Sequence, residues 1–557
     1  MTSSRPRSVS PWLFLGLVAV ALIFQLLVVE RHLGIYDESL QLFDAEHVLR
    51  GQMPYRDFWT MYGPAQFYVL AGFFKLFGTS ALTARVYDAL IKSCLASTCF
   101  LLVSDFARRT IAWLTFAFVI LWMTCGGGQI NFPIYPALLC SLISTIFLSC
   151  YIRGPQAPRK IFFAGLLVGA TATFRLDFGF YICFAEVITL FWFTIFRPGH
   201  VSTLTAWPKL RRPALIYFAG VLLIALPVLL WLLWTVPLHD LFYQLFYVPA
   251  KIYPKVRNLP FQHLGELRNL LNPLTRASRG SAKEWMVVFP LLISLLGLSA
   301  LFTSRLSSRP LFETGVQRFI FALLLLLAPL FFIKGLVRVG DTHELPSIVV
   351  ALCLFAILMS RRRYLSRLLL VPSLACTVFL LACSVPVLLS ALSDVRHNSL
   401  ALFRSSDASS FRSTCHPPAG LERARCLIVD PAEIAAVQYV EQRTTPADRI
   451  YVGAGRHDKL LLNNVSFYFL ADRFSVTKWY DLHPGVQTTL PIQNEIIDSL
   501  RFYAPKLIVL DTSFDDVQEP NASRNSSGVT ALDDYIHSHY SPQARFGTFI
   551  VLAPDQH

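Results

Sequence analysis

The sequence carries little charge for its length. Only 15% of its 557 residues are Asp, Glu, Lys or Arg, whereas 54% are hydrophobic. Because a soluble protein of this size carries about 25% charged residues, the composition excludes an ordinary globular enzyme. The sequence also lacks a phosphate loop, a dinucleotide fingerprint, a nucleophile elbow, a structural zinc spacing and the internal repeats typical of transporters.

Long apolar runs are what the sequence does contain. Each run of roughly 16–25 residues can cross a hydrocarbon core of about 30 Å as a helix. The runs predict a polytopic α-helical membrane protein with about eleven transmembrane helices, at 12–29, 81–103, 110–125, 133–151, 160–174, 178–196, 214–236, 285–303, 316–333, 346–360 and 366–391. The shorter segment from Ala65 to Phe77 predicts an interfacial or re-entrant helix in the first outside loop.

The net charge of +14 comes from Lys and Arg in every second loop. Such an alternation predicts that these loops, and the N-terminus with them, are cytoplasmic. We find no basic run interleaved with aromatics, so we expect membrane lipids rather than nucleic acid as partners. The opposite, outer side then receives segments 30–80, 126–132, 175–177, 237–284, 334–345 and everything after 392.

The composition becomes that of a globular domain near residue 393. The sequence therefore predicts a transmembrane catalytic domain at 1–392 and a small extracytoplasmic α/β domain at 393–557. Asp430-Pro431 predicts a helix start, and β-type runs predict strands at Arg449–Val452, Lys506–Leu510 and Thr548–Leu552. Cys415 and Cys426 predict a disulfide if this domain lies outside the cytoplasm.

Two adjacent carboxylates, Asp37 and Glu38, directly follow the first apolar run. A carboxylate at a membrane boundary cannot help a helix to span lipid, but it can take a proton, hold a cation or bind a hydroxyl. Other charged residues fall on the same predicted side in separate loops, which predicts one shared site. They are Arg56, Asp57, Arg175, Asp177, Lys251, Lys255, Arg257, Arg338, Asp341 and His343.

The first outside loop contains Tyr36-Asp37-Glu38, then Met53-Pro54-Tyr55-Arg56-Asp57-Phe58, then Tyr62-Gly63-Pro64. This arrangement resembles the first loop of the GT-C membrane glycosyltransferases. It is most similar to the rhizobial lipopolysaccharide glycosyltransferase-like (RgtA/B/C/D-like) group, with protein O-mannosyltransferases and the aminoarabinose lipid A transferase as relatives. The resemblance implies inverting transfer of a sugar from a polyprenyl phosphate to a lipid, glycan or protein hydroxyl, on the outer side of a bacterial inner membrane.

The resemblance also assigns roles to residues. Asp37 is expected to be the general base, and Glu38 to position the acceptor, to hold a divalent cation or to share the base role. The leaving phosphate needs cations or donors, expected from Arg56, Arg175, Arg338 and His343. Substrate positioning is expected from Asp57, Tyr62, Asp177 and Asp341.

Simpler explanations stand beside these roles. Asp37 could be a helix N-cap, and Arg56–Asp57 and Arg175–Asp177 could be local ion pairs. The aromatic and cationic loop 237–284 suits an interfacial belt or a lid over the site. Two other functions also remain open, a lipid or solute transporter and a non-catalytic scaffold for polysaccharide assembly.

Overall fold

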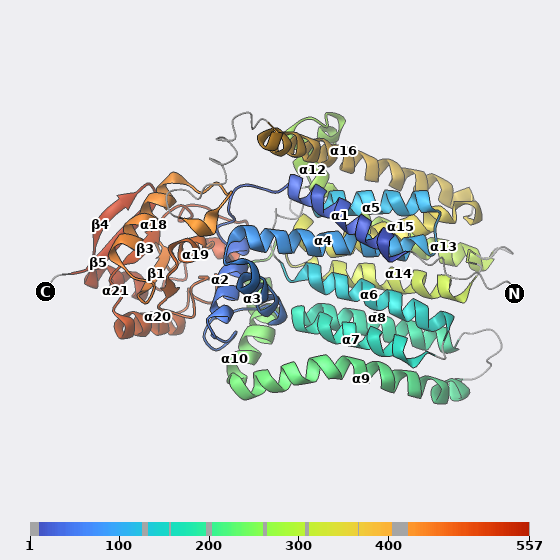
Figure 1. Ribbon diagram of the computed structural model, residues 1–557, viewed down its shortest axis with the longest axis horizontal. Coiled ribbons are helices and arrows are strands. Elements are labelled where there is room, and N and C mark those ends of the chain that lie inside the picture. Colours follow the sequence, from blue (N-terminus) through green and yellow to red (C-terminus); the bar gives the residue numbers. More distant parts are fainter. Residues whose placement is uncertain are drawn as a thin grey trace.

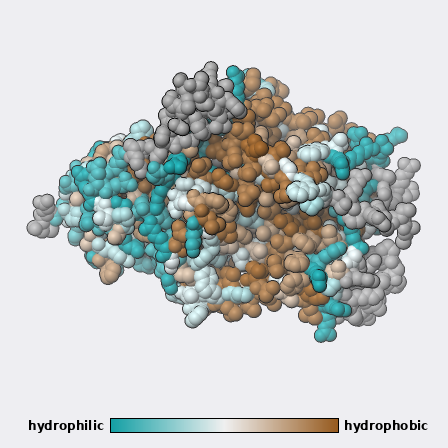
Figure 2. Space-filling model, in the orientation of Figure 1, coloured by the Kyte–Doolittle hydropathy of each residue, from teal (hydrophilic) through white to brown (hydrophobic). Residues whose placement is uncertain are grey.

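Long helices lie side by side along the longest axis of the protein, and a small sheet domain covers one end of them (Figure 1). The computed structural model describes residues 10–124, 132–154, 157–195, 203–259, 264–306, 311–312, 314–365, 367–403 and 421–555. A hydrophobic surface band covers the helices, and hydrophilic residues gather on the sheet domain and at the far end (Figure 2). This distribution is that of a polytopic membrane protein with a domain outside the bilayer.

Each predicted span coincides with a helix of the structure. These helices are α1 (Pro11–Leu27), α4 (Ala81–Ser104), α5 (Arg109–Met123), α6 (Ile134–Arg153), α7 (Pro158–Phe174), α8 (Leu176–Ile195), α9 (Thr203–Thr235), α13 (Phe289–Leu306), α14 (Gly315–Gly335), α15 (Asp341–Ser360) and α16 (Arg367–Phe403). Within the described residues, eight helical stretches are long and apolar enough to cross a membrane. The predicted fold class is confirmed, whereas the number of eleven spans stays a prediction.

Local sequence explains where several of these helices begin. The Ser10 side chain accepts from the Trp12 N–H ahead of Pro11 at the first position of α1, and Ser80 accepts from the Thr83 N–H at the start of α4. Thr314 and Gln317 form a capping box at α14. These side chains satisfy backbone donors that the first turn of a helix leaves free.

Helices α7 and α9 pack closely because glycines face each other. A Cβ on Gly165 would lie 2.0 Å from the Tyr217 carbonyl oxygen, and one on Gly220 would lie 2.3 Å from that of Phe162. Within lipid, where the hydrophobic effect does not drive helices together, small residues allow the close backbone approach that holds them.

Short elements on the sheet-domain side connect the long helices. They are α2 (Asp37–Leu49), α3 (Ala65–Phe77), α10 (Leu238–Phe242), the π-helix η1 (Tyr243–Ile252), α11 (Tyr253–Val256), the 3₁₀ helix η2 (Leu267–Leu271) and α12 (Arg276–Met286). Helix α3 has the predicted bounds of the short apolar segment. In Figure 1, α2, α3 and α10 lie between the long helices and the sheet domain.

The C-terminal domain has a five-stranded sheet of order β2-β1-β3-β5-β4. Strands β1 (Arg449–Ala454), β2 (Phe474–Ser475) and β3 (Ile508–Asp511) are parallel, and β5 (Phe549–Pro554) is antiparallel to β3 and β4 (Tyr540–Phe546). Its helices are α18 (Pro431–Arg443), α19 (Ser466–Ala471), α20 (Leu490–Tyr503) and α21 (Ala531–His539). The Asp430 side chain caps α18 by accepting from the Ala432 N–H at 2.7 Å, as predicted.

Helix α16 continues through the predicted boundary at 392/393 as far as Phe403. The division into domains 1–392 and 393–557 stays a prediction. Cys426 is disulfide-bonded, but Cys415 lies outside the described residues, so the predicted pairing of the two stays a prediction too.

We predict that Gly165→Ala will lower the thermal unfolding temperature of the detergent-purified protein. The added Cβ would meet the backbone oxygen of Tyr217, and a backbone atom cannot move aside as a flexible side chain can. Gly72→Ala in α3 is the matched control because a Cβ there meets nothing within 4 Å. An equal unfolding temperature for both variants would contradict the close-packing explanation.

Candidate functional site

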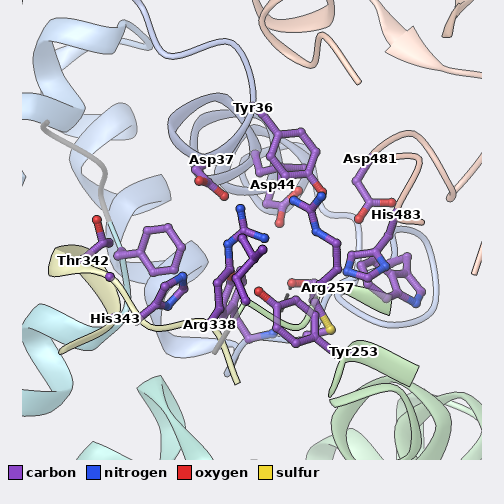
Figure 3. A pocket seen from close by; sticks show the side chains of 18 of the residues that line it. Tyr36, Asp37, Asp44, Tyr253, Arg257, Arg338, Thr342, His343, Asp481 and His483 are labelled. Carbon is purple, nitrogen blue, oxygen red and sulfur yellow. Dashed lines mark hydrogen bonds between the residues drawn. The ribbon is translucent and has the colours of Figure 1, made fainter. Parts of the chain in front are cut away.

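A cavity of about 450 Å³ lies where the long helices, the first-loop elements and the sheet domain meet. Figure 3 shows Asp37, Arg257, Arg338, His343 and Asp481 directed into it. Its described lining comes from segments far apart in the chain: Tyr36, Asp37, Leu40, Asp44, Trp59, Thr60, Met61, Tyr62, Phe132, Tyr253, Arg257, Leu259, Arg338, Val339, Gly340, Asp341, Thr342, His343, Asp481 and His483.

Asp37 is the first residue of α2, and Tyr36 holds the N-cap position without a side-chain cap. The alternative that Asp37 is the N-cap is therefore wrong. The Asp37 side chain is exposed to the cavity, while protein surrounds the cavity itself. This partial removal from water raises the pKa of Asp37, and the positive charges of Arg257 and Arg338 oppose the rise.

Glu38 is not among the residues that line this cavity, and its carboxylate is paired elsewhere. Its carboxylate pairs with Arg85 of α4 through contacts of 2.7 and 2.9 Å, and both side chains are buried. The Gly34 N–H also donates to it at 2.8 Å. Glu38 therefore anchors the first loop to the helices, and the structure does not bring it to Asp37 as a second site carboxylate.

Two arginines in the cavity share one carboxylate from the sheet domain. Arg338 donates to both oxygens of Glu519, at 3.0 and 2.5 Å, and Arg257 donates to the same carboxylate at 3.1 Å. The two guanidinium groups hold the pKa of Glu519 near 2, although partial burial acts against this. We call these three residues the arginine–glutamate triad.

Backbone pairing places the two arginines together. The Leu259 N–H donates to the Val337 carbonyl at 2.9 Å, and the Val339 N–H donates to the Leu259 carbonyl at 3.0 Å. This short bridge joins the end of the loop after α9 to the segment before α15. Loop 237–284 thus contributes an arginine to the cavity wall, which is more than an interfacial belt would do.

Residues of the sheet domain form two further hydrogen bonds that involve carboxyl groups of the cavity wall. Tyr480 donates a short hydrogen bond to Asp44 of α2, and Asp481 accepts from Gln487 at 2.7 Å. Burial raises the pKa of Asp44 well above its usual value and that of Asp481 to about 8. At neutral pH we therefore expect Asp481 to hold a proton, and burial favours the protonated form of Asp44 in the same direction.

Several predicted site residues do line the cavity. Asp37, Tyr62, Arg338, Asp341 and His343 all contribute to its wall. Asp341 also forms an ion pair with Lys283 at 3.0 Å. The structure thus brings together these five residues, which lie in separate segments on the same predicted side, while the roles expected of them stay predictions.

Other predicted residues lie away from the cavity in local ion pairs. Arg56 donates to Asp57 at 2.9 and 2.8 Å, and Arg175 donates to Asp177 at 2.9 and 2.5 Å. The Arg175 guanidinium lies 5.5 Å from the ring centroid of Tyr62, which places it behind the cavity wall. Neither pair is among the lining residues, so neither arginine is placed to contact a phosphate there.

Sequence reasoning left Asp44, Asp481 and Glu519 out of the site, and it placed Arg257 on the correct side without giving it a role. Arg257 stood in the aromatic and cationic loop, and the stretch Trp479-Tyr480-Asp481-Leu482-His483 places an acid and a histidine among apolar residues. That acid–histidine pair was the available indication.

Within the described ranges, no group of three or more His, Cys, Asp or Glu is arranged to hold a metal ion.

Comparison with known proteins identifies the architecture. No protein-family model matches the chain, and no curated protein matches it by sequence. Among solved structures, apo ArnT from Cupriavidus metallidurans matches with a TM-score of 0.55 at 14% identity, covering 97% of each chain. The apo oligosaccharyltransferase of Archaeoglobus fulgidus matches with a TM-score of 0.54 at 13% identity, covering 98% of this chain and 75% of that one.

Both neighbours are GT-C superfamily glycosyltransferases. The chain has a GT-C fold. The fold that the first-loop resemblance implied is thereby confirmed. ArnT has also been solved with undecaprenyl phosphate bound, and that structure matches with a TM-score of 0.51 at 14% identity over 98% of each chain. At these identities the likeness establishes the GT-C fold, and chemistry has to be argued from the cavity itself.

We predict that Glu519→Gln will strengthen binding of inorganic pyrophosphate to the purified protein by at least about tenfold, since a hydrogen bond to a charged group is worth roughly 1.5 kcal/mol or more. The change removes the resident anion from the arginine–glutamate triad. Isothermal titration calorimetry measures the affinity. Asp516→Asn is the control because that exposed carboxylate lies on the same loop. Equal affinities in the two variants would contradict this description of the triad.

Proposed function

We propose that the protein is an inverting glycosyltransferase that takes a sugar from a polyprenyl phosphate and transfers it to an acceptor hydroxyl. The observation that carries the proposal is the cavity in which Asp37 faces Arg257 and Arg338. Among the described residues no hydrogen bond or ion pair holds the Asp37 carboxylate. It is thus available to take a proton from a bound alcohol.

The proposed step balances as a single displacement. The acceptor oxygen attacks the anomeric carbon while the bond from that carbon to the phosphate oxygen breaks. The acceptor proton passes to Asp37, and the bonding electron pair leaves with the polyprenyl phosphate. Arg338 and Arg257 stabilise the negative charge that develops on the leaving phosphate, with His343 on the same wall.

The solved neighbours support this class of reaction. ArnT has been solved bound to undecaprenyl phosphate, and the Archaeoglobus fulgidus oligosaccharyltransferase has been solved tethered to an acceptor peptide. In the present chain, Arg56 and Arg175 are paired with Asp57 and Asp177 and do not line the cavity, so we assign them no direct phosphate contact. A divalent cation beside Asp37 and Glu38 stays a prediction, and no step here depends on one.

The position of the cavity bears on the alternative that the protein is a transporter. It lies at the sheet-domain end of the helices and is not midway along them, which gives a transporter no support. We propose that this end faces the periplasm or another extracytoplasmic space of a bacterial inner membrane, with the N-terminus in the cytoplasm. The alternating loop charges support that orientation.

We predict that Asp37→Asn will reduce sugar transfer by at least about a hundredfold, because a positioned general base contributes roughly 10²–10⁴-fold. Mass spectrometry of envelope glycans, in cells that carry either form of the protein, measures the transfer. Asp498→Asn is the control because that side chain is 74% exposed on α20, remote from the cavity lining. Unchanged glycans with Asp37→Asn would refute the base assignment.

We also predict that the charge of Arg338 affects the pH dependence of sugar transfer. A general base acts only when deprotonated, so activity falls as pH drops through the pKa of Asp37. Burial raises that pKa and Arg338 lowers it. Replacing Arg338 by Gln should therefore move the acid limb of kcat/KM to higher pH.

The matched variant Arg338→Lys keeps the positive charge, so its acid limb should stay near that of the wild type. Transfer of a labelled sugar from a polyprenyl phosphate to acceptor, measured across pH in detergent, gives both profiles. An acid limb at the same pH in Arg338→Gln and Arg338→Lys would show that the titrating group is not Asp37.

A further inference from the structure

A second cavity, of about 540 Å³, lies among α5, α15 and α16. It is at the end of the helices where α4 connects to α5 and α15 connects to α16, opposite the sheet domain. The residues that line it are Arg108, Thr110, Ile111, Leu114, Thr115, Phe118, Leu352, Phe355, Ala356, Met359, Ser360, Arg362, Arg363, Thr377, Leu380 and Leu381. None of them belongs to the candidate active site.

Three arginines stand at one end of this groove. Arg108 precedes α5, and Arg362 and Arg363 lie in the short 3₁₀ helix η3 (Arg362–Tyr364) between α15 and α16. All three are exposed. In the described part of the chain no carboxylate pairs with them, and nearby Asp105 is already paired with Arg153 at 3.0 Å. The groove thus ends in positive charge that nothing described here neutralises.

The rest of the groove is apolar. Leu352, Phe355 and Ala356 of α15 form a buried floor. Leu114 of α5 and Leu381 of α16 line the cavity and remain 58% and 48% exposed. An apolar channel that leads away from a cationic cluster matches an amphiphile with an anionic head and a hydrocarbon tail.

We propose that this groove binds an anionic phospholipid. The phosphate head accepts hydrogen bonds from Arg108, Arg362 and Arg363, and one acyl chain lies between α5 and α16 over the α15 floor. This site is separate from the proposed active site and does not depend on the proposed reaction. By the loop charges it lies in the cytoplasmic leaflet, where anionic lipids attract basic segments.

A free phosphate ion would use only part of the groove. The arginines would attract it, but the apolar walls offer it nothing. A phospholipid can also pack an acyl chain against these walls, and this van der Waals contact adds to the charge contacts. Binding of a phospholipid therefore requires an open groove between α5 and α16 for its acyl chain, whereas binding of a free phosphate ion does not.

The test uses the full chain in detergent, titrated with phosphatidylglycerol or with phosphatidylcholine of the same acyl chains, and native mass spectrometry to count bound lipid. We expect tighter binding of phosphatidylglycerol. The triple variant Arg108→Gln, Arg362→Gln, Arg363→Gln should weaken it by about a hundredfold, at roughly fivefold for each arginine. The control triple is Arg211→Gln, Arg212→Gln, Arg318→Gln, at exposed positions on the same end of the helices but outside the groove.

A second pair of variants tests the tail. Thr377→Trp on α16 fills the groove and should weaken phosphatidylglycerol binding, whereas Val378→Trp, on a side chain that is 57% exposed and outside the lining, should not. Equal phosphatidylglycerol binding by the two arginine triples would overturn the proposal. Full binding by Thr377→Trp, or competition by inorganic phosphate at the lipid's own affinity, would overturn it in favour of a free-anion site.

Discussion

The contact of Glu519 with Arg257 and Arg338 is the interaction on which the cavity depends. Two guanidinium groups that bind the same carboxylate carry like charges close together and repel each other. Glu519 offsets that repulsion. Because its three members come from the loop after α9, the segment before α15 and the sheet domain, the triad joins three parts of the chain around one space.

The first loop is held to the same domain by a second set of contacts. Arg423 donates to Glu46 at 2.6 and 2.9 Å, the Trp59 N–H donates to the Lys478 carbonyl at 3.1 Å, and Phe43 packs in a shared hydrophobic core with residues of the sheet domain. Helix α2 is consequently buried along most of its length. The sheet domain thus forms one wall of the cavity and fixes the helix that begins with Asp37.

Local features of the fold could be predicted from sequence, and pairings between distant residues could not. Apolar length predicted the long helices, and Asp430-Pro431 predicted the start of α18, since both depend on neighbours in the chain. Glu38 looked like a partner of Asp37 because the two are adjacent, yet its charge is satisfied by Arg85, 47 residues away. Glu519 gave no local indication, because its role arises only when the sheet domain meets residues 257 and 338.

Charge balance in the cavity connects this architecture to the proposed chemistry. Asp37 and Glu519 face the two positive charges of Arg257 and Arg338, while Asp341 on the same wall is paired with Lys283. If a donor phosphate binds as proposed, it competes with the Glu519 carboxylate for the same two arginines. Because the proposed reaction needs an ionised Asp37, we expect Glu519 to be the carboxylate that the phosphate displaces. On the proposed reaction, donor binding would therefore weaken the contact that Glu519 makes between the sheet domain and the two arginines.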